Sequence, residues 1–424
     1  MSSTQKSPPN ATSREVVNHF FRHEYGRVVS FLVGRFGTGN IESIEDAVQE
    51  ALIKAMTNWP LTGVPENPSA WVLTTARNKL IDQFRRQSNF DEKAASIVSD
   101  QQEAETPHEV NLVGELNDDL LKMIFACCDP SISEENQIIL SLKILCGFGN
   151  KEIATCLLKS EDAVAKSYTR ARLKLKESHF KFEVPIGRSL NERLDKILQI
   201  IYLLFTEGYK AARGNQLLRQ DLCVEAMRLT QLILDNKLLS KPSAHALMAL
   251  MCFQASRFDT RVDLEGNIVP LHEQDRGQWN GELIQKGVAH MDKSMGFEGL
   301  SDYHLQAAIA ACYSVARDFE NTDWKQILSL YDIQLSKAPN KMVALNRVIP
   351  FSKVEGPTKG LELLSTLKDD MFNTHYLFHA IAGELHAELR NGKEAKMHYQ
   401  MAHDLAENQL EKIYLRKKVS QHEG

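Results

Sequence analysis

Apolar residues recur at the spacing of amphipathic helices along most of the 424-residue chain, whereas no stretch shows the sustained alternation of a β-strand. Helical spacing is clear over residues 14–87, returns over residues 118–181 and continues over residues 186–418. We therefore predict an all-α protein in which two small helical regions precede a long series of helices.

Polar stretches interrupt this pattern and divide the chain. Residues 1–13 are polar and contain Pro and Ser, which predicts a disordered tail. Residues 88–117 lose the apolar spacing and are rich in Ser, Gln, Glu and Asp, which predicts a linker, and residues 182–185 form a shorter junction. The pattern thus predicts one folded region on each side of the linker and a third after the junction.

The third region shows faint internal repetition. Four residues fall where a tetratricopeptide repeat (TPR) places its small and aromatic packing residues: Gly383, Ala395, Tyr399 and Ala402. Helix hairpins of this kind stack because no single hairpin can bury its apolar face alone. We therefore predict a TPR-like helical domain over residues 186–418.

Composition is that of a folded protein without a membrane segment. Apolar residues make up 43% and charged residues 25%. No apolar run is long enough to cross a bilayer, and the first residues (MSSTQKSPPN) lack the apolar segment of a signal peptide. The seven cysteines include no CxxC pair, so we expect reduced, mostly buried thiols in a cytoplasmic protein.

Charge is distributed unevenly, although the net charge is only −5. Residues 166–176 hold five basic residues and no acidic one, whereas residues 91–119 hold nine acidic residues and only Lys93 as a basic one. A basic stripe near an acidic linker predicts two partners of different charge.

Residues 136–176 have the pattern of a helix-turn-helix. Gly147 and Gly149 break a first helix over residues 136–146, a second helix follows, and Ser160 is placed to cap the third. On the third helix one apolar face is formed by Val164, Tyr168, Ala171 and Leu175.

The other sides of this third helix carry five cations: Lys166, Arg170, Arg172, Lys174 and Lys176. A helix of this kind suits the DNA major groove, where its first turns meet base edges and its later cations neutralise phosphates. A solvated surface face is the alternative, but such faces normally mix both signs of charge, so we favour DNA binding.

A second basic helix is predicted to start at Asn67 and Pro68, after a loop that contains Gly63. The helix before this loop is expected to end at the Trp59–Pro60 pair. The helix carries one acidic residue, Asp82, and four cations: Arg77, Lys79, Arg85 and Arg86. Two aromatic residues, Trp71 and Phe84, are interleaved with them. This combination suits the binding of unpaired bases, although both aromatic residues also fit a core.

Three segments resemble the sigma factors of bacterial RNA polymerase. Residues 44–59 (IEDAVQEALIKAMTNW) resemble the region that docks on the polymerase clamp, and residues 69–86 (SAWVLTTARNKLIDQFRR) resemble the region that melts and reads the −10 promoter element. Residues 150–176 resemble the helix-turn-helix that reads the −35 element. The segment between these regions is too short for the additional folded region of primary sigma factors, so the chain resembles the compact extracytoplasmic-function (ECF) group.

The resemblance implies partners and site residues. Three residues would bind the clamp of the RNA polymerase core, whose flap lies beside the −35-binding region: Asp46, Gln49 and Glu50. A loop over residues 61–66 would capture a flipped base, and the −10 contacts would be Gly63, Asn67, Arg77, Asn78, Arg85 and Arg86. The −35 contacts would be Ser160, Lys166, Ser167, Arg170, Arg172 and Lys174. The acidic linker would thread the RNA-exit path of the polymerase.

The chain departs from the resemblance at Ser167 and Tyr168, where relatives usually carry a basic and an aliphatic residue. We expect the −35 preference of this protein to differ from theirs for that reason.

Residues 186–418 resemble the long C-terminal TPR-like extension of one ECF subgroup. Its recurring blocks correspond to residues 201–209 (IYLLFTEGY), 273–279 (EQDRGQW), 305–311 (LQAAIAA) and 343–347 (VALNR). Because stacked helices offer a concave binding surface, we expect this extension to bind a protein or ligand and to regulate the factor in place of a membrane-bound anti-sigma factor. The polar block 273–279 fits either a buried salt bridge beside a packed Trp279 or part of a ligand or partner pocket.

Enzymatic chemistry has little support in the sequence, and we expect no catalytic residue, cofactor or metal. The pairs His19/His23 and His375/His379 lack a ligand cluster around them, and Cys127 fits packing at a helix end. Two other classes remain open. One is a conventional activator or repressor with a helical-repeat sensor, and the other is a repeat scaffold whose N-terminal helices only pair with proteins.

Overall fold

The computed structural model describes residues 13–88, 109–157, 159–177, 182–210, 220–296, 299–368 and 373–422. The predicted tail, apart from Ser13, and residues 89–108 of the predicted acidic linker lie outside the described residues. Regular structure in the described part is helical, and β-pairing there is limited to one isolated bridge between Val262 and Ile268. The prediction of an all-α protein is therefore confirmed.

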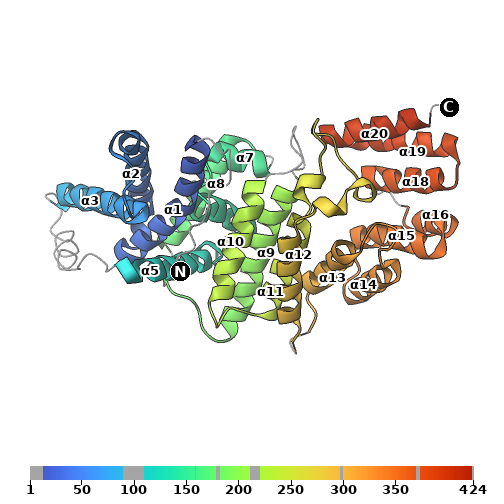
Figure 1. Ribbon diagram of the computed structural model, residues 1–424. Coiled ribbons are helices and arrows are strands. Elements are labelled where there is room, and N and C mark those ends of the chain that lie inside the picture. Colours follow the sequence, from blue (N-terminus) through green and yellow to red (C-terminus); the bar gives the residue numbers. More distant parts are fainter. Residues whose placement is uncertain are drawn as a thin grey trace. The chain divides into compact units, whose positions relative to one another are not determined.

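The chain forms two compact units, Met1–Ile200 and Ile201–Gly424. The helices of the first unit (Figure 1) are α1 (Ser13–Phe36), η1 (Thr38–Asn40), α2 (Ile41–Thr62), α3 (Pro68–Ser88), α5 (Glu109–Cys127), α6 (Glu134–Leu140), the π-helical turn η2 (Ser141–Leu145), α7 (Asn150–Leu157), α8 (Glu161–Glu177) and the first part of α9 (Arg188–Lys210).

The second unit contains the rest of α9 and the helices that follow it in the chain. These are α10 (Gln220–Asp235), α11 (Pro242–Ala255), α12 (Gly281–Ser294), α13 (Asp302–Val315), α14 (Trp324–Lys337), α15 (Lys341–Glu355), α16 (Pro357–Thr366), α18 (Tyr376–Glu388), α19 (Gly392–Leu405) and α20 (Gln409–Gln421). Three short 3-10 helices lie between α11 and α12: Phe258–Thr260, Leu271–Glu273 and Arg276–Gln278.

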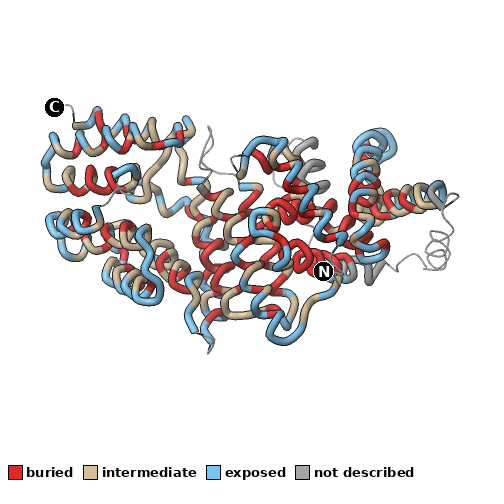
Figure 2. Tube along the Cα trace, turned by 180° about the vertical axis from the view of Figure 1, so that it is seen from behind, coloured by how far each residue is buried: buried red, intermediate tan, exposed pale blue. Residues whose placement is uncertain are grey.

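Helix α1 organises the core of the first unit, because it packs against α2, α3, α5 and η2. Its inner face buries Val28, Leu32 and Val33, and α2 adds Ile44 and Val48 to the same core. These are apolar positions at helical spacing, so their burial follows from the sequence pattern. Buried residues occupy the inner sides of these helices in Figure 2.

Two helix ends differ from the sequence prediction. Helix α2 does not end at the Trp59–Pro60 pair but continues to Thr62, where Gly63 stops it with a φ of 88°. Pro60 gives up one N–H hydrogen bond, but the next turn still closes, with Gly63 N donating to Trp59 O at 2.9 Å. The first helix of the helix-turn-helix ends at Leu140 and passes into the π-helical turn η2 instead of remaining α-helical to residue 146.

Consecutive helices of the second unit pack in pairs, including α11 with α12, α14 with α15, and α18 with α19. Helix α11 is buried along nearly its whole length. The four residues with TPR-like spacing are buried on α18 and α19, and a Cβ atom on Gly383 would lie 2.8 Å from the ring of Tyr399. This close approach explains why a glycine stands opposite that large side chain.

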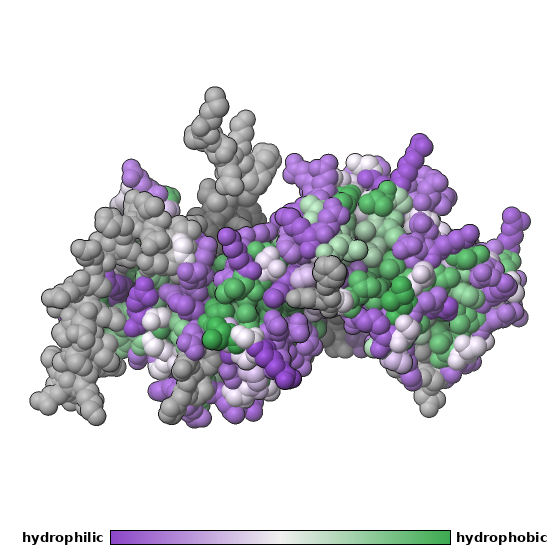
Figure 3. All heavy atoms as spheres, turned by 90° about the horizontal axis from the view of Figure 1, so that it is seen from below, coloured by the Kyte–Doolittle hydropathy of each residue, from purple (hydrophilic) through white to green (hydrophobic). Residues whose placement is uncertain are grey.

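Hydrophilic residues cover most of the face shown in Figure 3, with separate apolar patches between them. Scattered exposed apolar residues are normal on folded proteins, so these patches do not by themselves mark a binding site. Within the described ranges, none of the helices combines the length and the apolar character that a bilayer span requires.

Candidate nucleic-acid interface

The third helix of the helix-turn-helix, α8, begins where the sequence predicts. Ser160 lies directly before it, and its Oγ accepts a hydrogen bond from the backbone N–H of Ala163 at 3.2 Å. Glu161 and Asp162 occupy the first turn, where their negative charge stabilises the positive end of the helix dipole. This local cap fixes where α8 starts and therefore which residues lie on each side of it.

The cations of α8 do not share one environment. Lys166, Arg170 and Lys174 are exposed, as are Ser160 and Lys176. The apolar face predicted for this helix, which includes Val164 and Leu175, is buried. An exposed line of cations at four-residue spacing can therefore meet DNA phosphates without any change in the fold.

Arg172 and Ser167 are placed differently from these exposed cations. Arg172 is half-buried and forms an ion pair with Glu42 of α2 at 3.0 Å. Ser167 is buried, with 6% of its surface exposed. Both residues would reach DNA only if α8 left its present contact with the rest of the unit.

That contact centres on Glu45, a buried carboxylate of α2 that the sequence analysis did not single out. Tyr168 of α8 donates its hydroxyl hydrogen bond to Glu45 Oε2 at 2.6 Å, and Tyr25 of α1 donates to Oε1 at 2.9 Å. The Arg172 guanidinium lies 4.0 Å from the same carboxylate. One side chain therefore joins the predicted −35-reading helix to the two helices of the predicted clamp-binding region.

Burial sets the electrostatics of this cluster. Burial raises the pKa of Glu45, and the hydrogen bonds from Tyr168 and Tyr25 oppose the shift. Burial, followed by the negative charge of Glu45, raises the pKa of both tyrosine hydroxyls well above their usual range. Both phenols therefore stay protonated and act as hydrogen-bond donors.

A second contact between the same two regions is made by backbone. A Cβ atom added to Gly26 of α1 would lie 2.4 Å from Leu145 O and 3.0 Å from Ile144 O in the π-helical turn η2. No other residue type fits here unless the turn moves. The sequence contains a signal for each of these two contacts. Glu45 is a charged residue on an otherwise apolar helix face, and Gly26 is a glycine inside a helical pattern, which indicates a close approach of another part of the chain.

The second predicted basic helix, α3, also begins as expected. The Oδ1 atom of Asn67 accepts a hydrogen bond from Ala70 N at 3.0 Å, with Pro68 as the first helical residue. Asn78, Arg85, Arg86 and Gly63 are exposed, whereas Arg77 is half-buried.

The two aromatic residues of α3 serve the core. The ring of Trp71 meets that of Trp59 edge-on at 5.5 Å, and the ring of Phe84 lies 5.6 Å from that of Phe36. Both rings are partly buried, so base stacking on them would require a rearrangement.

The three predicted polymerase contacts lie along α2. Asp46 and Gln49 are exposed, and Glu50 is half-exposed. Glu50 pairs with Lys79 of α3 at 2.6 Å and with Lys54 at 3.0 Å, and these partners lower its pKa. Glu45, which holds α8, is the immediate neighbour of Asp46 in the sequence.

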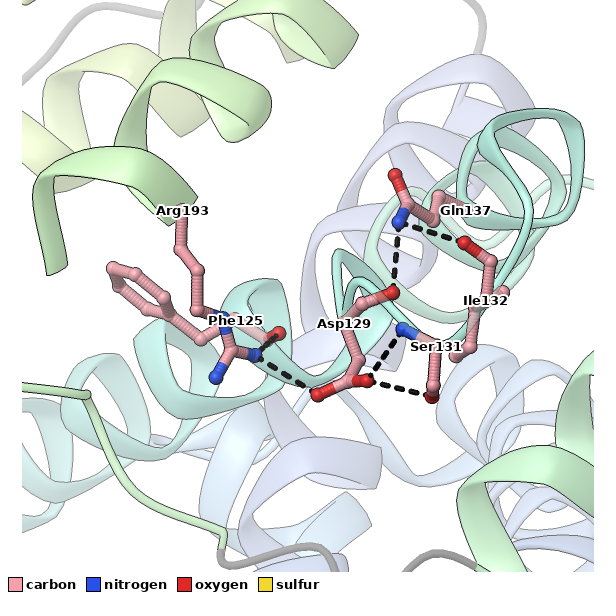
Figure 4. Close-up of polar contacts among 6 residues, drawn as sticks. All are labelled: Phe125, Asp129, Ser131, Ile132, Gln137 and Arg193. Atoms are coloured by element: carbon pink, nitrogen blue, oxygen red, sulfur yellow. Dashed lines mark hydrogen bonds and ion pairs between the residues drawn. The ribbon is translucent and has the colours of Figure 1, made fainter. Parts of the chain in front are cut away.

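The first part of α9 belongs to the first unit through Arg193. Figure 4 shows this side chain reaching the end of α5, where it donates to the backbone oxygen of Phe125 and lies 3.5 Å from the carboxylate of Asp129. Asp129 also accepts from Ser131 N at 2.9 Å. The junction after α8 is therefore followed by a helix whose first part is fixed to the end of α5.

The polar block 273–279 forms no salt bridge through Arg276. Trp279 is buried as expected, and the Arg276 guanidinium lies 5.1 Å from its ring centroid. Arg276 donates to the backbone oxygens of Tyr313 and Ala316 at 2.7 and 2.8 Å, and among the described residues it has no carboxylate partner. Arg276 therefore serves the end of α13, which leaves carbonyl groups that need donors.

Residues with possible catalytic or metal chemistry have structural roles. Cys127 is buried, and burial raises the pKa of the adjacent Cys128 to about 12, so neither thiol is activated. His375 accepts from Leu377 N, and His379 lies 3.2 Å from Asn373 O. The described residues contain no cluster of His, Cys, Asp and Glu that could hold a metal ion. The structure does not describe the side chains of His19 and His23.

Comparison with known proteins assigns two segments to families. Residues 20–90 match the model of sigma-70 region 2, and residues 193–295 match a family of unknown function (DUF6596). No solved structure matches the chain.

Two relatives differ in how much of the chain they cover. An uncharacterized protein of Rhizobium meliloti, R00370, is 36% identical over 381 residues, which is 89% of each chain. The ECF RNA polymerase sigma factor SigL of Mycobacterium tuberculosis is 30% identical over 128 residues, which is 30% of this chain and 69% of SigL.

Proposed function

Since the chain belongs to the extracytoplasmic-function (ECF) sigma factors of RNA polymerase, we propose that its first unit makes two promoter contacts and that residues 186–418 regulate them. Residues 14–87 would bind the polymerase clamp and open the −10 element, and residues 118–181 would bind the −35 duplex beside the flap. The observation that supports this most directly is the pair of capped helices, α3 and α8, which expose cations: Arg85 and Arg86 on α3, and Lys166, Arg170, Lys174 and Lys176 on α8. The partners are then the RNA polymerase core and promoter DNA.

At the −35 element, Lys166, Arg170 and Lys174 would neutralise phosphates, and the first turn of α8 beyond Ser160 would meet base edges. At the −10 element, Arg85 and Arg86 would follow the melted strand along the exposed side of α3. The acidic linker is proposed to occupy the RNA-exit path, where its charge would resemble that of nucleic acid.

The contact between α8 and α2 adds a conformational requirement. Glu45 holds Tyr168 while Asp46 and Gln49, its neighbours on α2, would bind the clamp. We propose that engagement of polymerase and promoter separates α8 from α2, which would expose Ser167 and Arg172 to DNA. The closed arrangement would then be the form without polymerase.

The experiment that tests the sigma function is reconstitution. RNA polymerase core that lacks any sigma factor should gain promoter-specific run-off transcription when this protein is added. A conventional activator or repressor would instead require a sigma factor already present, and a repeat scaffold would give no transcript. Absence of run-off product on promoters taken from RNA induced by overexpression would overturn the proposal, provided that another sigma factor activates the same core.

Regulation by the C-terminal region is tested by truncation. Because α9 begins in the first unit, the cut should follow Lys210, not the junction at residues 182–185. The truncated chain should differ from the full chain in run-off activity or in the activity of a reporter in cells. Equal activity under every condition would show that these residues do not regulate the factor.

Single substitutions at Arg170 or Lys174 to alanine are expected to weaken promoter binding in a salt-dependent manner. Each lost phosphate contact should reduce the slope of log affinity against log salt by about 1, measured by anisotropy with a promoter duplex. Lys325→Ala, an exposed lysine of α14, is the matched control and should leave the slope unchanged. An unaltered affinity and slope in both α8 variants would remove this helix from the interface.

A further inference from the structure

The second unit contains a cavity of about 320 Å³ that the sigma function does not use. Its walls come from five helices, α9, α11, α13, α14 and α15, with residues from position 202 onward. This volume lies at the small end of the range for ligand pockets, so it suits a metabolite. Four tyrosines and several carboxamides line it, together with apolar side chains such as Phe253 and Ile309.

Some polar groups in the cavity wall have no hydrogen-bond partner within the described ranges. Gln334 has only 7% of its surface exposed, and its carboxamide makes no hydrogen bond to another described residue. The hydroxyl of Tyr331 has none either, and burial raises the pKa of that phenol to about 12. Both side chains line the cavity, so they are available to accept and donate hydrogen bonds to a bound molecule.

Other polar groups of the cavity are already positioned. Tyr202 donates to Gln306 Oε1 at 2.7 Å, which orients both side chains. Arg257 donates through Nε to the hydroxyl of Tyr209 at 3.1 Å, which fixes the guanidinium at the wall. Side chains held in this way are prepared to receive a ligand without further loss of conformational entropy.

The charge around the cavity is positive. Arg257 lines it, and Arg261 lies 3.9 Å from the ring centroid of Tyr209, which also lines it. In the described part of the chain, neither arginine forms an ion pair, nor does Arg276, and no acidic residue lines the cavity. Burial lowers the pKa of Arg261, and the charge of Arg257 acts in the same direction; burial also lowers the pKa of Arg276, but there the carboxylates of Asp318 and Glu320 oppose the shift. A negative group on a ligand would relieve this repulsion.

From these observations we propose that the cavity binds a small organic anion, a carboxylate on an apolar body. The carboxylate would bind Arg257, while Tyr331 and Gln334 would hydrogen-bond to the ligand. Its apolar body would lie against Phe253 and Ile309. This inference goes beyond the sigma function, because binding requires neither polymerase nor DNA.

Calorimetry on the full chain tests it with benzoate, salicylate, cinnamate and phenylacetate, each compared with its carboxamide. At least one acid should bind in a one-to-one ratio with a Kd below about 1 mM, and its carboxamide should bind at least about tenfold more weakly. Absence of binding by all four acids, or equal binding of acid and carboxamide, would overturn the proposal.

Substitutions then locate the binding site. Tyr331→Phe should weaken binding about threefold to tenfold, and Arg257→Gln about tenfold or more, because a hydrogen bond to a charged group is the stronger kind. The matched controls are Tyr414→Phe, a half-buried phenol elsewhere in the unit, and Arg317→Gln, an exposed arginine. Both controls should bind as the unchanged chain does. Equal loss in the controls, or no loss in Tyr331→Phe, would place the ligand elsewhere and overturn the assignment.

Discussion

Replacing Glu45 with alanine is expected to lower the free energy of unfolding of the first unit by about 2 kcal/mol. The hydroxyls of Tyr25 and Tyr168 would lose their acceptor in a buried site, and each unsatisfied hydroxyl costs about 1–3 kcal/mol. Removal of the carboxylate also removes the desolvation cost that raises the pKa of Glu45, which offsets part of this loss. Urea unfolding of the full chain, followed by hydrogen exchange in α2 and α8, measures the effect.

Glu45→Gln is the matched control, because its amide can still accept from one tyrosine and donate to the other. We expect it to change stability by less than about 1 kcal/mol. Since the folded-state pKa of Glu45 is raised, the part of its stabilisation that comes from this shift is fully present below the unfolded value of 4.5 and is lost as pH rises through the folded pKa. Because glutamine does not titrate, the Glu45→Gln variant should not lose this part of its stability as pH rises. If Glu45→Ala unfolds like the unchanged chain, the buried network does not hold α8 to α2.

The helix caps and the buried face of α8 could be predicted from the sequence, because each depends on residues within one helix. Ser160 and Asn67 cap helices through hydrogen bonds to a residue three positions away. The buried face of α8 follows from 3.6-residue periodicity, which places Val164, Ala171 and Leu175 on one side. Each of these conclusions required only a window of one helix.

Tertiary contacts could not be predicted in the same way. Glu45 and Tyr168 are separated by 123 positions, and no periodicity links them. The π-helical turn contacts α1 at Gly26, and the hydrophobic pattern of residues 136–146 does not encode this contact. The sequence of the block 273–279 does not show the partners of Arg276 either, because the residues that accept from it belong to the end of a helix about 40 positions further along.

The cavity of the second unit could not be predicted from the sequence either, because it also depends on tertiary contacts. Its lining residues come from segments between positions 202 and 346, and no pattern within a single segment indicates a cavity. The block with sequence IYLLFTEGY supplies Tyr202, Thr206 and Tyr209, and the block VALNR supplies Val343 and Asn346. The resemblance identified these blocks as recurring, but only the fold brings them to one cavity.

Substitution of Gly26 with alanine is expected to loosen α1 from the π-helical turn and to strengthen binding of the isolated chain to −35 DNA. Alanine gains about 1 kcal/mol over glycine in helix propensity, but overpacking against an immobile backbone costs about 1–3 kcal/mol. The second effect is the larger, because the added Cβ would lie 2.4 Å from Leu145 O, a backbone atom that cannot rotate away. The closed arrangement should therefore lose about 1 kcal/mol of its stability.

If that arrangement hides Ser167 and Arg172, its loss should tighten binding of the isolated chain to a −35 duplex about fivefold, since the apparent Kd varies inversely with the open fraction. Anisotropy measures the affinity, and hydrogen exchange in residues 141–145 reports whether the turn has become accessible. Gly39→Ala is the matched control, because a Cβ atom there meets no atom within 4 Å. An unchanged affinity in a Gly26→Ala chain whose turn exchanges freely would show that closure does not limit DNA binding. In that case the exposed cations of α8 would be sufficient for binding to DNA.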